Sequence, residues 1–510
     1  MNIKRTWPTP WVLLLALALP LAAGGTVRAG STQEPKTIDP ARVWDDSSSF
    51  YVSNIFDTLV RLDPVTMKIE PSLAVRWETS ADGRTWTFHL RQGVSFHDGT
   101  PFNADAVVFS FRRQMRPAGS DRLEDFPLFP EIFIYLKDVR KAGPDQVQFI
   151  LSEPFFPFLA SLTVDCAAIV SPAAVKRLGA AFARQPVGTG PFKLASWQRN
   201  KRLVLVANDD YWRGRPAVDK YIDTIEPRAE MLSKYFQDGT VDILSTYSIS
   251  KMVSYRKQEW VRVVSSPIFS VMYVVLNAAR PQLKSLSVRQ ALCHAWDPRA
   301  LKLVFQDYVL PIHSLLPAGL DGGGRREAPL GFSLAKAQAL LKKEGAGGEI
   351  QLEMLVQREE GLLFQLFSMY ATNLKQLGVR LKLTRLDAQE YARRIAGGDY
   401  DLTYSGWIAD YPDPDSMLFP LLSQKLQQQG FATVAASGRS DLLQRLTQAR
   451  REGDAGRRWA AYLDIDRAFV GDGLVLPMYQ DKRVIIFNRR LGTIPANPLG
   501  KLLLFELRMK

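Results

Sequence analysis

The stretch that decides the fold is PSLAVRWETSADGRTWTFHLRQGVSFHDGTPFNADAVVF, which runs from Pro71 to Phe109. Within it, residues 84–91 alternate strictly between apolar and polar side chains, a pattern typical of a half-buried strand. A turn of small polar residues, HDGTP, follows at 97–101. Asn103 then predicts the start of a helix, because its side chain can cap the first turn. The stretch therefore predicts a strand, a turn and a helix in close succession.

Strand and helix patterns alternate along the rest of the chain, without an internal repeat. Ser333 is the predicted cap of one helix, and Asp454 is the predicted cap of another. The remaining predicted elements are helices over 334–344, 362–377, 441–451 and 455–470, and strands over 379–384, 400–404 and 475–479. These patterns indicate an α/β protein with mixed sheets in at least two lobes.

The amino terminus has the pattern of an export signal. Lys4 and Arg5 precede an apolar run, WVLLLALALPLAA over 11–23, and small residues follow it. The run is too short to cross about 30 Å of hydrocarbon, and Pro20 interrupts it, so a membrane anchor is not expected. Because no Cys lies near the possible cleavage sites, we expect no lipid anchor. We predict a signal peptide over residues 1–24 and a periplasmic mature protein.

Composition narrows the classes of protein further. About 480 residues remain after the signal, more than one domain normally uses. The two cysteines, Cys166 and Cys293, rule out a disulfide framework, although one bridge stays open. The net charge of +13 comes from scattered basic residues rather than a basic helix. We therefore expect a basic surface and no nucleic-acid partner.

Few residues are of the kinds that build catalytic or metal centres. None of the four histidines is at metal-ligand spacing with another His or Cys, and no G-x-S-x-G motif occurs. The glycine-rich PVGTGP at 186–191 lacks the Lys of a phosphate loop. We expect no metal, no cofactor and no enzyme activity. An exported hydrolase is a remote alternative, because carboxylate pairs are common in a chain of this length.

Five segments, in order, resemble the solute-binding proteins of peptide-type ABC importers, the dipeptide- and oligopeptide-binding family. They cover nearly the whole mature chain: EPKTIDP at 34–40, the stretch 71–109, PVGTGPFKLASW at 186–197, VRQAL at 288–292 and GWIADYPDP at 406–414. The resemblance implies a two-lobed periplasmic binding protein fold with a two-stranded hinge and an extra inserted domain. It also implies that the signal ends before a first strand that begins near Thr26.

The resemblance also implies domain boundaries and a function. Lobe I would comprise 26–70, 187–267 and 477–510, the inserted domain 71–186, and lobe II 268–476. The protein would capture di- or oligopeptides in the cleft between the lobes and deliver them to an ABC permease complex in the inner membrane. We expect it to be a monomer. Other solutes that the same fold would suit are a nickel complex, an opine, a glutathione-like conjugate or an oligosaccharide.

The motif GWIADYPDPD contains the main candidate residues of the site. Read alone, its acids and prolines indicate a rigid turn, and its spacing does not fit a calcium loop. In the family, the acid at the position of Asp410 pairs with the α-ammonium group of a peptide, and Trp407 would line a side-chain pocket. Some relatives have an Arg for a carboxylate where this chain has Tyr404.

The remaining candidates carry over less directly. Trp44, Asp45 and Asp46 match the loop where family members meet the main chain of a peptide. Arg358 is a candidate substitute for the missing carboxylate-binding Arg, although a solvated residue before a helix is the alternative reading. Ligand length and side-chain preference do not follow from these positions.

Overall fold

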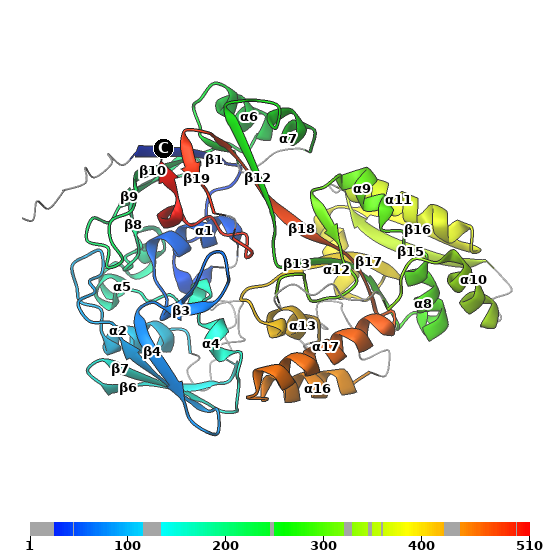
Figure 1. Cartoon of the computed structure of the whole chain (residues 1–510), viewed down its shortest axis with the longest axis horizontal. Helices are drawn as coiled ribbons and strands as arrows, with labels where there is room; N and C mark the ends of the chain where they lie inside the picture. The colour runs from blue at the N-terminus through cyan, green and yellow to red at the C-terminus, as the bar shows by residue number, and fades with distance from the viewer. Residues whose placement is uncertain are drawn as a thin grey trace, which may run out of the picture.

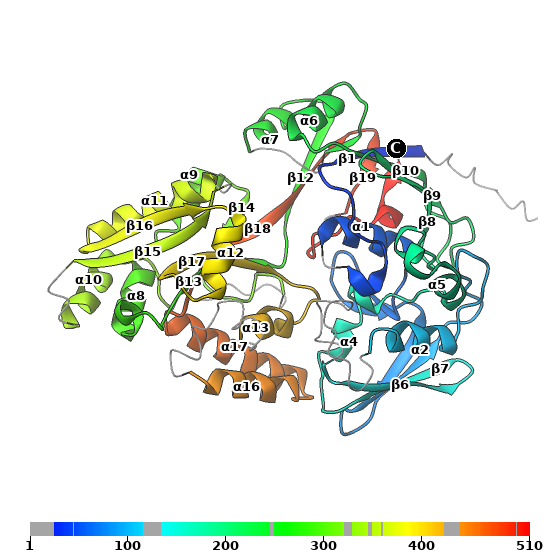
Figure 2. The ribbon, with the colours of Figure 1, turned by 180° about the vertical axis from the view of Figure 1, so that it is seen from behind.

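The computed structural model describes residues 25–43, 45–115, 134–244, 249–320, 329–344, 349–358, 361–422, 439–495 and 497–509. Two lobes lie side by side, and long strands cross from one to the other (Figures 1 and 2). Helices and mixed sheets occur in both lobes, so the α/β class predicted from the sequence is confirmed. The exact domain boundaries stay a prediction.

The first lobe is built around one half of a large sheet. Its strand order is β11 (Ile243–Leu244), β1 (Gly25–Ser31), β10 (Val218–Ile225), β9 (Arg202–Ala207) and β8 (Phe192–Gln198). Strand β1 runs parallel to β10 and to β11. Further elements of this lobe are α1 (Asp46–Ile55), α6 (Ala229–Gln237), α7 (Ile249–Tyr255), β19 (Leu491–Thr493) and β20 (Arg508–Met509). Side chains of α1 and the sheet share one buried apolar cluster.

The stretch that opened the sequence analysis supplies two strands of a separate sheet, which lies below this lobe in Figure 1. Its order is β4 (Ala74–Thr79), β5 (Thr85–Leu90), β7 (Gln146–Leu151) and β6 (Leu136–Gly143), with α2 (Ala104–Arg112) packed against β6 and β7. The predicted alternation is confirmed, because Trp86, Phe88 and Leu90 are buried. The predicted cap is also confirmed, since Asn103 accepts a hydrogen bond from the Ala106 N–H at 3.1 Å.

Short elements join this inserted sheet to the first lobe. They are β2 (Val60–Leu62), β3 (Ile69–Pro71), α4 (Phe158–Ser161) and α5 (Pro172–Leu178). Their apolar residues divide between the cluster of the inserted sheet and that of the first lobe. The inserted domain and the first lobe are therefore packed together as one side of the molecule.

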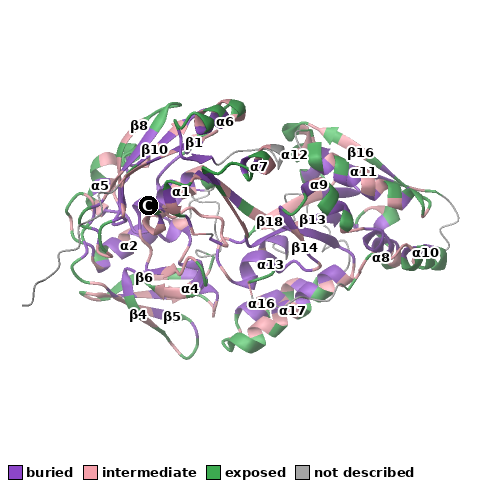
Figure 3. Cartoon of the chain, turned by 45° about the horizontal axis from the view of Figure 1, so that its top comes forward, coloured by how far each residue is buried: buried purple, intermediate pink, exposed green. Residues whose placement is uncertain are grey.

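The second lobe has its sheet covered on both faces. The strands are β16 (Val379–Leu386), β15 (Ile350–Gln357), β17 (Leu402–Ile408) and β13 (Ser270–Leu276). One apolar cluster includes α8 (Leu286–His294), α9 (Arg299–Phe305), α10 (Leu334–Lys343) and α11 (Gly361–Lys375). The other includes α12 (Ala388–Ala396), α13 (Pro414–Leu422), α16 (Asp441–Arg450) and α17 (Ala455–Gly471). Figure 3 shows exposed residues on the outer side of α16 and buried residues on the side that it turns to the rest of the lobe.

Two paths of chain connect the lobes. Strand β18 (Val475–Asn488) pairs with β12 (Val261–Pro267) in one half and with β13 in the other, and β14 (Val309–Pro311) also pairs with it. The strand predicted over 475–479 is therefore much longer than expected. The one predicted over 400–404 is displaced, since β17 continues to Ile408. Strand β17 is extended by its pairing with β13, and β18 by its pairing with β13 and β12. Both strands therefore run beyond the apolar residues from which they were predicted.

Two further features concern the predicted cellular location and the cysteines. Within the described ranges, no helix is both long enough and apolar enough to cross a membrane. Cys166 and Cys293 form no disulfide, and both are buried, in the clusters of the inserted domain and the second lobe respectively. The disulfide that the sequence left open is therefore absent from this structure.

Candidate functional site

A cavity of about 150 Å³, here the cleft cavity, lies where the two sides of the molecule meet. Four segments far apart in the sequence surround it: the start of α1, the loop 164–166, the end of β17 and the carboxyl-terminal segment. Its lining residues are Val43, Asp45, Asp46, Ser49, Val164, Asp165, Cys166, Ile408, Ala409, Asp410, Leu499 and Lys501. Three of the residues predicted from the sequence are therefore brought together.

Asp410 follows β17 and lines the cleft cavity from the second lobe. Its backbone N–H donates to the Ser416 Oγ at 2.8 Å, and Ser416 is buried in α13. The motif therefore holds Asp410 between a sheet strand and a helix, so its position is defined by two rigid elements.

The two acids at the start of α1, the capping residue Asp45 and the first helical residue Asp46, have different environments. The Asp45 side chain caps the helix, because it accepts from the Ser48 N–H at 3.0 Å and from the Ser48 Oγ at 2.8 Å. Asp46 is exposed and lines two cavities. Of the two carboxylates, that of Asp46 is the more accessible to a solute.

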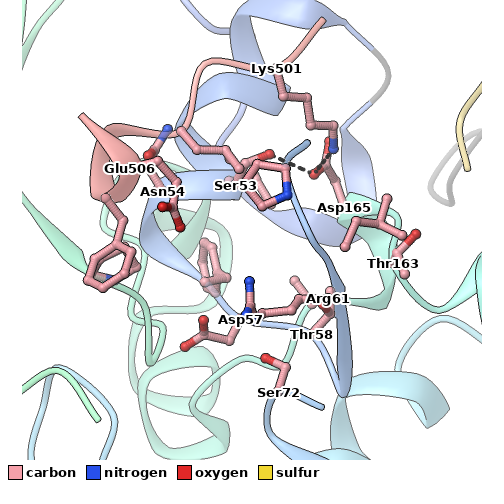
Figure 4. A pocket seen from close by; sticks show the side chains of 18 of the residues that line it. Ser53, Asn54, Asp57, Thr58, Arg61, Ser72, Thr163, Asp165, Lys501 and Glu506 are labelled. Atoms are coloured by element: carbon pink, nitrogen blue, oxygen red, sulfur yellow. Dashed lines mark hydrogen bonds and ion pairs between the residues drawn. The ribbon is translucent and has the colours of Figure 1, made fainter. Parts of the chain in front are cut away.

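Opposite Asp410, an ion pair forms part of the wall of the cleft cavity. The Lys501 Nζ lies 2.8 Å from the Asp165 Oδ1 (Figure 4). The hydroxyls of Ser49 and Ser53, both on α1, also donate to this carboxylate. These contacts tie the carboxyl-terminal segment, the inserted domain and α1 together at one point. No pattern in the sequence marked Asp165 or Lys501.

The same ion pair borders a second cavity, of about 130 Å³, inside the first side of the molecule (Figure 4). Asp57 lies in its wall and accepts hydrogen bonds from Thr189 Oγ1, Tyr211 OH and Trp212 Nε1, at 2.8, 2.9 and 3.0 Å. Burial raises the pKa of Asp57, while these donors act to lower it. This network is local to the first lobe and includes no residue predicted for the site.

A third cavity, of about 400 Å³, adjoins the cleft cavity and is here the hinge cavity. The two share Asp46, Ser49, Ile408, Leu499 and Lys501. Its other lining residues include strands of the first lobe and β18: Ala29, Ser31, Thr32, Gln33, Ser47, Phe50, Tyr51, Tyr221, Asp223, Ile243, Ile268, Arg483, Gly500 and Leu502. The five shared residues place the hinge cavity directly beside the cleft cavity.

The other predicted residues do not line the cleft cavity. Tyr404 packs with the cluster on the α11 face and its hydroxyl lies 2.6 Å from the Tyr479 hydroxyl. Trp407 is on the opposite face of β17, partly buried, and its Nε1 meets no acceptor among the described residues. Arg358 is exposed at the end of β15. Trp44 lies outside the described residues.

The two further acids of the motif are structural rather than solvated. Asp413 and Asp415 are only 6% and 0% exposed. Asp413 accepts from the Asp415 N–H and lies 3.2 Å from the Arg458 Nη2. Burial raises the pKa of Asp413 to about 6. These two acids of the turn are therefore buried, because α16 and α17 cover it.

The described residues contain no group of three or more His, Cys, Asp or Glu side chains placed to hold a metal ion. The acids of the cleft cavity are instead spread over α1, the inserted domain and the end of β17. The cleft cavity is therefore surrounded by separate charged side chains rather than by one cluster of metal ligands.

Residues 68–429 match the family model described as bacterial extracellular solute-binding proteins, family 5 Middle. The chain belongs to this family. The resemblance read from the five sequence segments is thus confirmed, and with it the assignment to the solute-binding proteins of peptide-type ABC importers.

Curated relatives agree with this assignment. The dipeptide-binding protein of Escherichia coli (strain K12) is 30% identical over 426 residues, which cover 78% of this chain and 79% of that protein. The probable D,D-dipeptide-binding periplasmic protein DdpA of the same organism is 26% identical over 509 residues and is covered to 96%, as is this chain.

Solved structures confirm the two-lobed fold. HbpA2 from Haemophilus parasuis superposes with a TM-score of 0.84 at 26% identity, over 95% of this chain and 100% of that one. The periplasmic binding protein DppA from Helicobacter pylori, in complex with the peptide STSA, gives 0.78 at 25% identity, over 95% and 98%. The family to which this solute-binding protein belongs is one of binding proteins rather than enzymes.

Proposed function

We propose that this protein captures di- or oligopeptides between its lobes, with the peptide's α-ammonium group at Asp410, and delivers them to an ABC permease complex in the inner membrane. The observation that carries the proposal is the position of Asp410 in a cavity walled by both sides of the molecule. A carboxylate there can form a charge-assisted hydrogen bond to an ammonium group, and a closed cleft limits screening by water.

The electrostatics of the cleft cavity support a ligand with an ammonium group. The cavity is lined by Asp45, Asp46, Asp165 and Asp410 against a single cation, Lys501, although the whole chain carries a net charge of +13. Since Lys501 is paired with Asp165, the accessible charge of the cavity is negative. A free peptide amino terminus would bring a positive charge to these carboxylates, whereas a neutral sugar would bring none.

Its location and mode of action follow from the same proposal. The protein would act in the periplasm as a monomer after removal of residues 1–24, without a lipid anchor, a nucleic-acid partner or a cofactor. It would release its solute chemically unchanged. Relatives with periplasmic names support this location.

A thermal-shift measurement on the mature protein tests the proposal. A peptide at about 100 times its Kd should stabilise the protein by about 2.7 kcal/mol, because it binds only the folded state. Asp410→Ala should abolish the shift, and N-acetylated peptides should give none with the parent protein. Asp464→Ala, which removes an exposed carboxylate on α17, is the matched control and should keep the shift.

Two results would contradict the proposal. Equal shifts from N-acetylated and free peptides would refute the ammonium contact, and the absence of a shift from any peptide would refute peptide capture. Native mass spectrometry of the purified protein identifies a retained solute directly and gives the oligomeric state. A solute recovered in a cleaved form would contradict the binding-only role.

A further inference from the structure

The hinge cavity is the part of the site that the sequence did not predict. It continues from the cleft cavity along the shared residues Asp46, Ser49 and Lys501, and it ends at the strand that connects the lobes. Its volume of about 400 Å³ lies within the range of small-molecule sites. A solute anchored at Asp410 therefore has room to reach the hinge.

Four basic side chains line the three cavities described above: Arg61, Arg213, Lys501 and Arg483. The first three are in ion pairs, with Glu70, Glu506 and Asp165 respectively. The side chain of Arg483, an exposed residue, has no ion-pair or hydrogen-bond partner within the part of the chain that the structure describes. Among the basic side chains that line these cavities, Arg483 is thus the one whose charge no described acid compensates.

Arg483 lies on β18, opposite Ser266 of β12 in the register of the two strands. Both strands belong to the connection between the lobes, so the backbone of Arg483 is held by a sheet while its side chain borders the hollow. A guanidinium group presents paired N–H donors that match the two oxygens of a carboxylate. Placed here, it can bind an anionic group without displacing an existing partner.

The acids near Arg483 leave its charge available. Asp223 lines the same cavity, but its carboxylate accepts from Tyr51 OH at 2.7 Å and from Ser31 Oγ at 2.9 Å. Burial raises the pKa of Asp223 to about 6, and its carboxylate is already occupied by the two hydroxyl donors. Asp46 is shared with the cleft cavity and lies on α1, toward Asp410.

We propose that Arg483 binds the carboxylate of the captured solute, so that the preferred solutes are short peptides with both a free ammonium group and a free carboxyl terminus. The inference rests on the peptide-binding function proposed above. It assigns the negative pole of the site to Asp410 in the cleft cavity and the positive pole to Arg483 in the adjoining hinge cavity. It also supplies the carboxylate partner that Tyr404 does not provide.

The test compares each peptide with its carboxyl-terminal amide by isothermal titration calorimetry, in the full mature chain. The parent should bind the free acid about 10- to 100-fold more tightly, because a hydrogen-bonded contact to a charged group is lost in the amide. Arg483→Gln should reduce this ratio to near one and leave the affinity for the amide unchanged. Arg483→Lys should restore part of the ratio, since the charge remains but the fork is lost.

Lys482→Gln is the matched control, because it removes a positive charge one residue away. The Lys482 Nζ donates to the Asp307 O rather than lining the hinge cavity. This variant should keep the parent's ratio. Circular dichroism of the ligand-free proteins verifies that each variant is folded.

Two outcomes would overturn the inference, and they are distinguishable. If Arg483→Gln keeps the parent's preference for the free acid, another residue binds the carboxylate, while peptide capture stands. If the parent binds free acid and amide equally, no carboxylate contact exists. Failure of every peptide to bind would refute the proposed function itself and the Arg483 assignment with it.

Discussion

Replacing Arg450 with Met should destabilise the protein and loosen the contact between its two sides. Arg450 ends α16 in the second lobe, and its side chain is 2% exposed. Its Nε lies 2.9 Å from the Asp415 Oδ1, a carboxylate with a fully buried side chain. The hydroxyls of Tyr411 and Tyr462 donate to the same carboxylate at 3.0 and 3.2 Å.

The surroundings of Arg450 come from both sides of the molecule. Its guanidinium carbon lies 3.7 Å from the ring centre of Phe419 in α13, and 4.7 and 5.1 Å from those of Phe155 and Tyr135 in the inserted domain. The Arg450 carbonyl also accepts from the Phe156 N–H at 3.1 Å. Loss of the side chain therefore removes contacts within the second lobe and contacts between the two sides.

The expected magnitude follows from the burial of the pair. Removing one partner of a buried ion pair costs about 3–5 kcal/mol, because the other charge stays buried without compensation. The Nε and Nη2 groups of Arg450 make no hydrogen bond of good geometry within the described ranges, which reduces what the native contact contributes. We therefore expect Arg450→Met to lose about 3 kcal/mol, at the lower limit of that range.

Urea unfolding followed by circular dichroism measures this loss. Arg451→Ala is the control, since Arg451 also bridges the two sides, to Glu153, but through side chains that are 45% and 39% exposed. Its effect should stay below about 1 kcal/mol. A loss in Arg450→Met as small as that of the control would refute the reasoning. Adding Asp415→Asn should recover part of the loss, and no recovery would assign the cost to the ring contacts instead.

Three further predictions concern buried groups. Burial lowers the pKa of His97 to about 4, so protons bind the unfolded chain more tightly and stability should fall between pH 6.5 and 4, by up to about 3 kcal/mol. His97→Gln should lessen that fall in urea titrations. Gly188→Ala should cost about 1–3 kcal/mol in the same assay, because a Cβ would meet the Ile55 O at 2.2 Å. Cys293, which is 1% exposed in the core of the second lobe, should react with a thiol reagent only after unfolding.

Each of these has a clear contrary result. An equally steep fall with acid in the His97 variant would contradict the first. Gly361→Ala, where an added Cβ meets nothing within 4 Å, is the control for the second, and equal losses would contradict the steric argument. Thiol reaction in the native protein would contradict the third.

The family resemblance identified some of the residues that line the cleft cavity and also some that do not, for different physical reasons. Asp410 was marked because it falls in a conspicuous local motif, and Asp45 and Asp46 because their loop matches a peptide-contacting loop of the family. The structure gathers all three around one cavity. Tyr404 and Trp407 came from the same motif, but β17 continues through it, so alternate residues face opposite sides of the sheet. Their roles in binding, like that of Asp410, stay predictions.

What the sequence determined by itself was local. The strand Thr85–Leu90 and the helix caps at Asn103, Ser333 and Asp454 depend on neighbours within a few residues, and all appear where predicted. The length of β18, the burial of Arg450 and the position of Arg483 beside a cavity were decided only by tertiary structure. Each depends on contacts between segments hundreds of residues apart, for which periodicity and capping carry no signal.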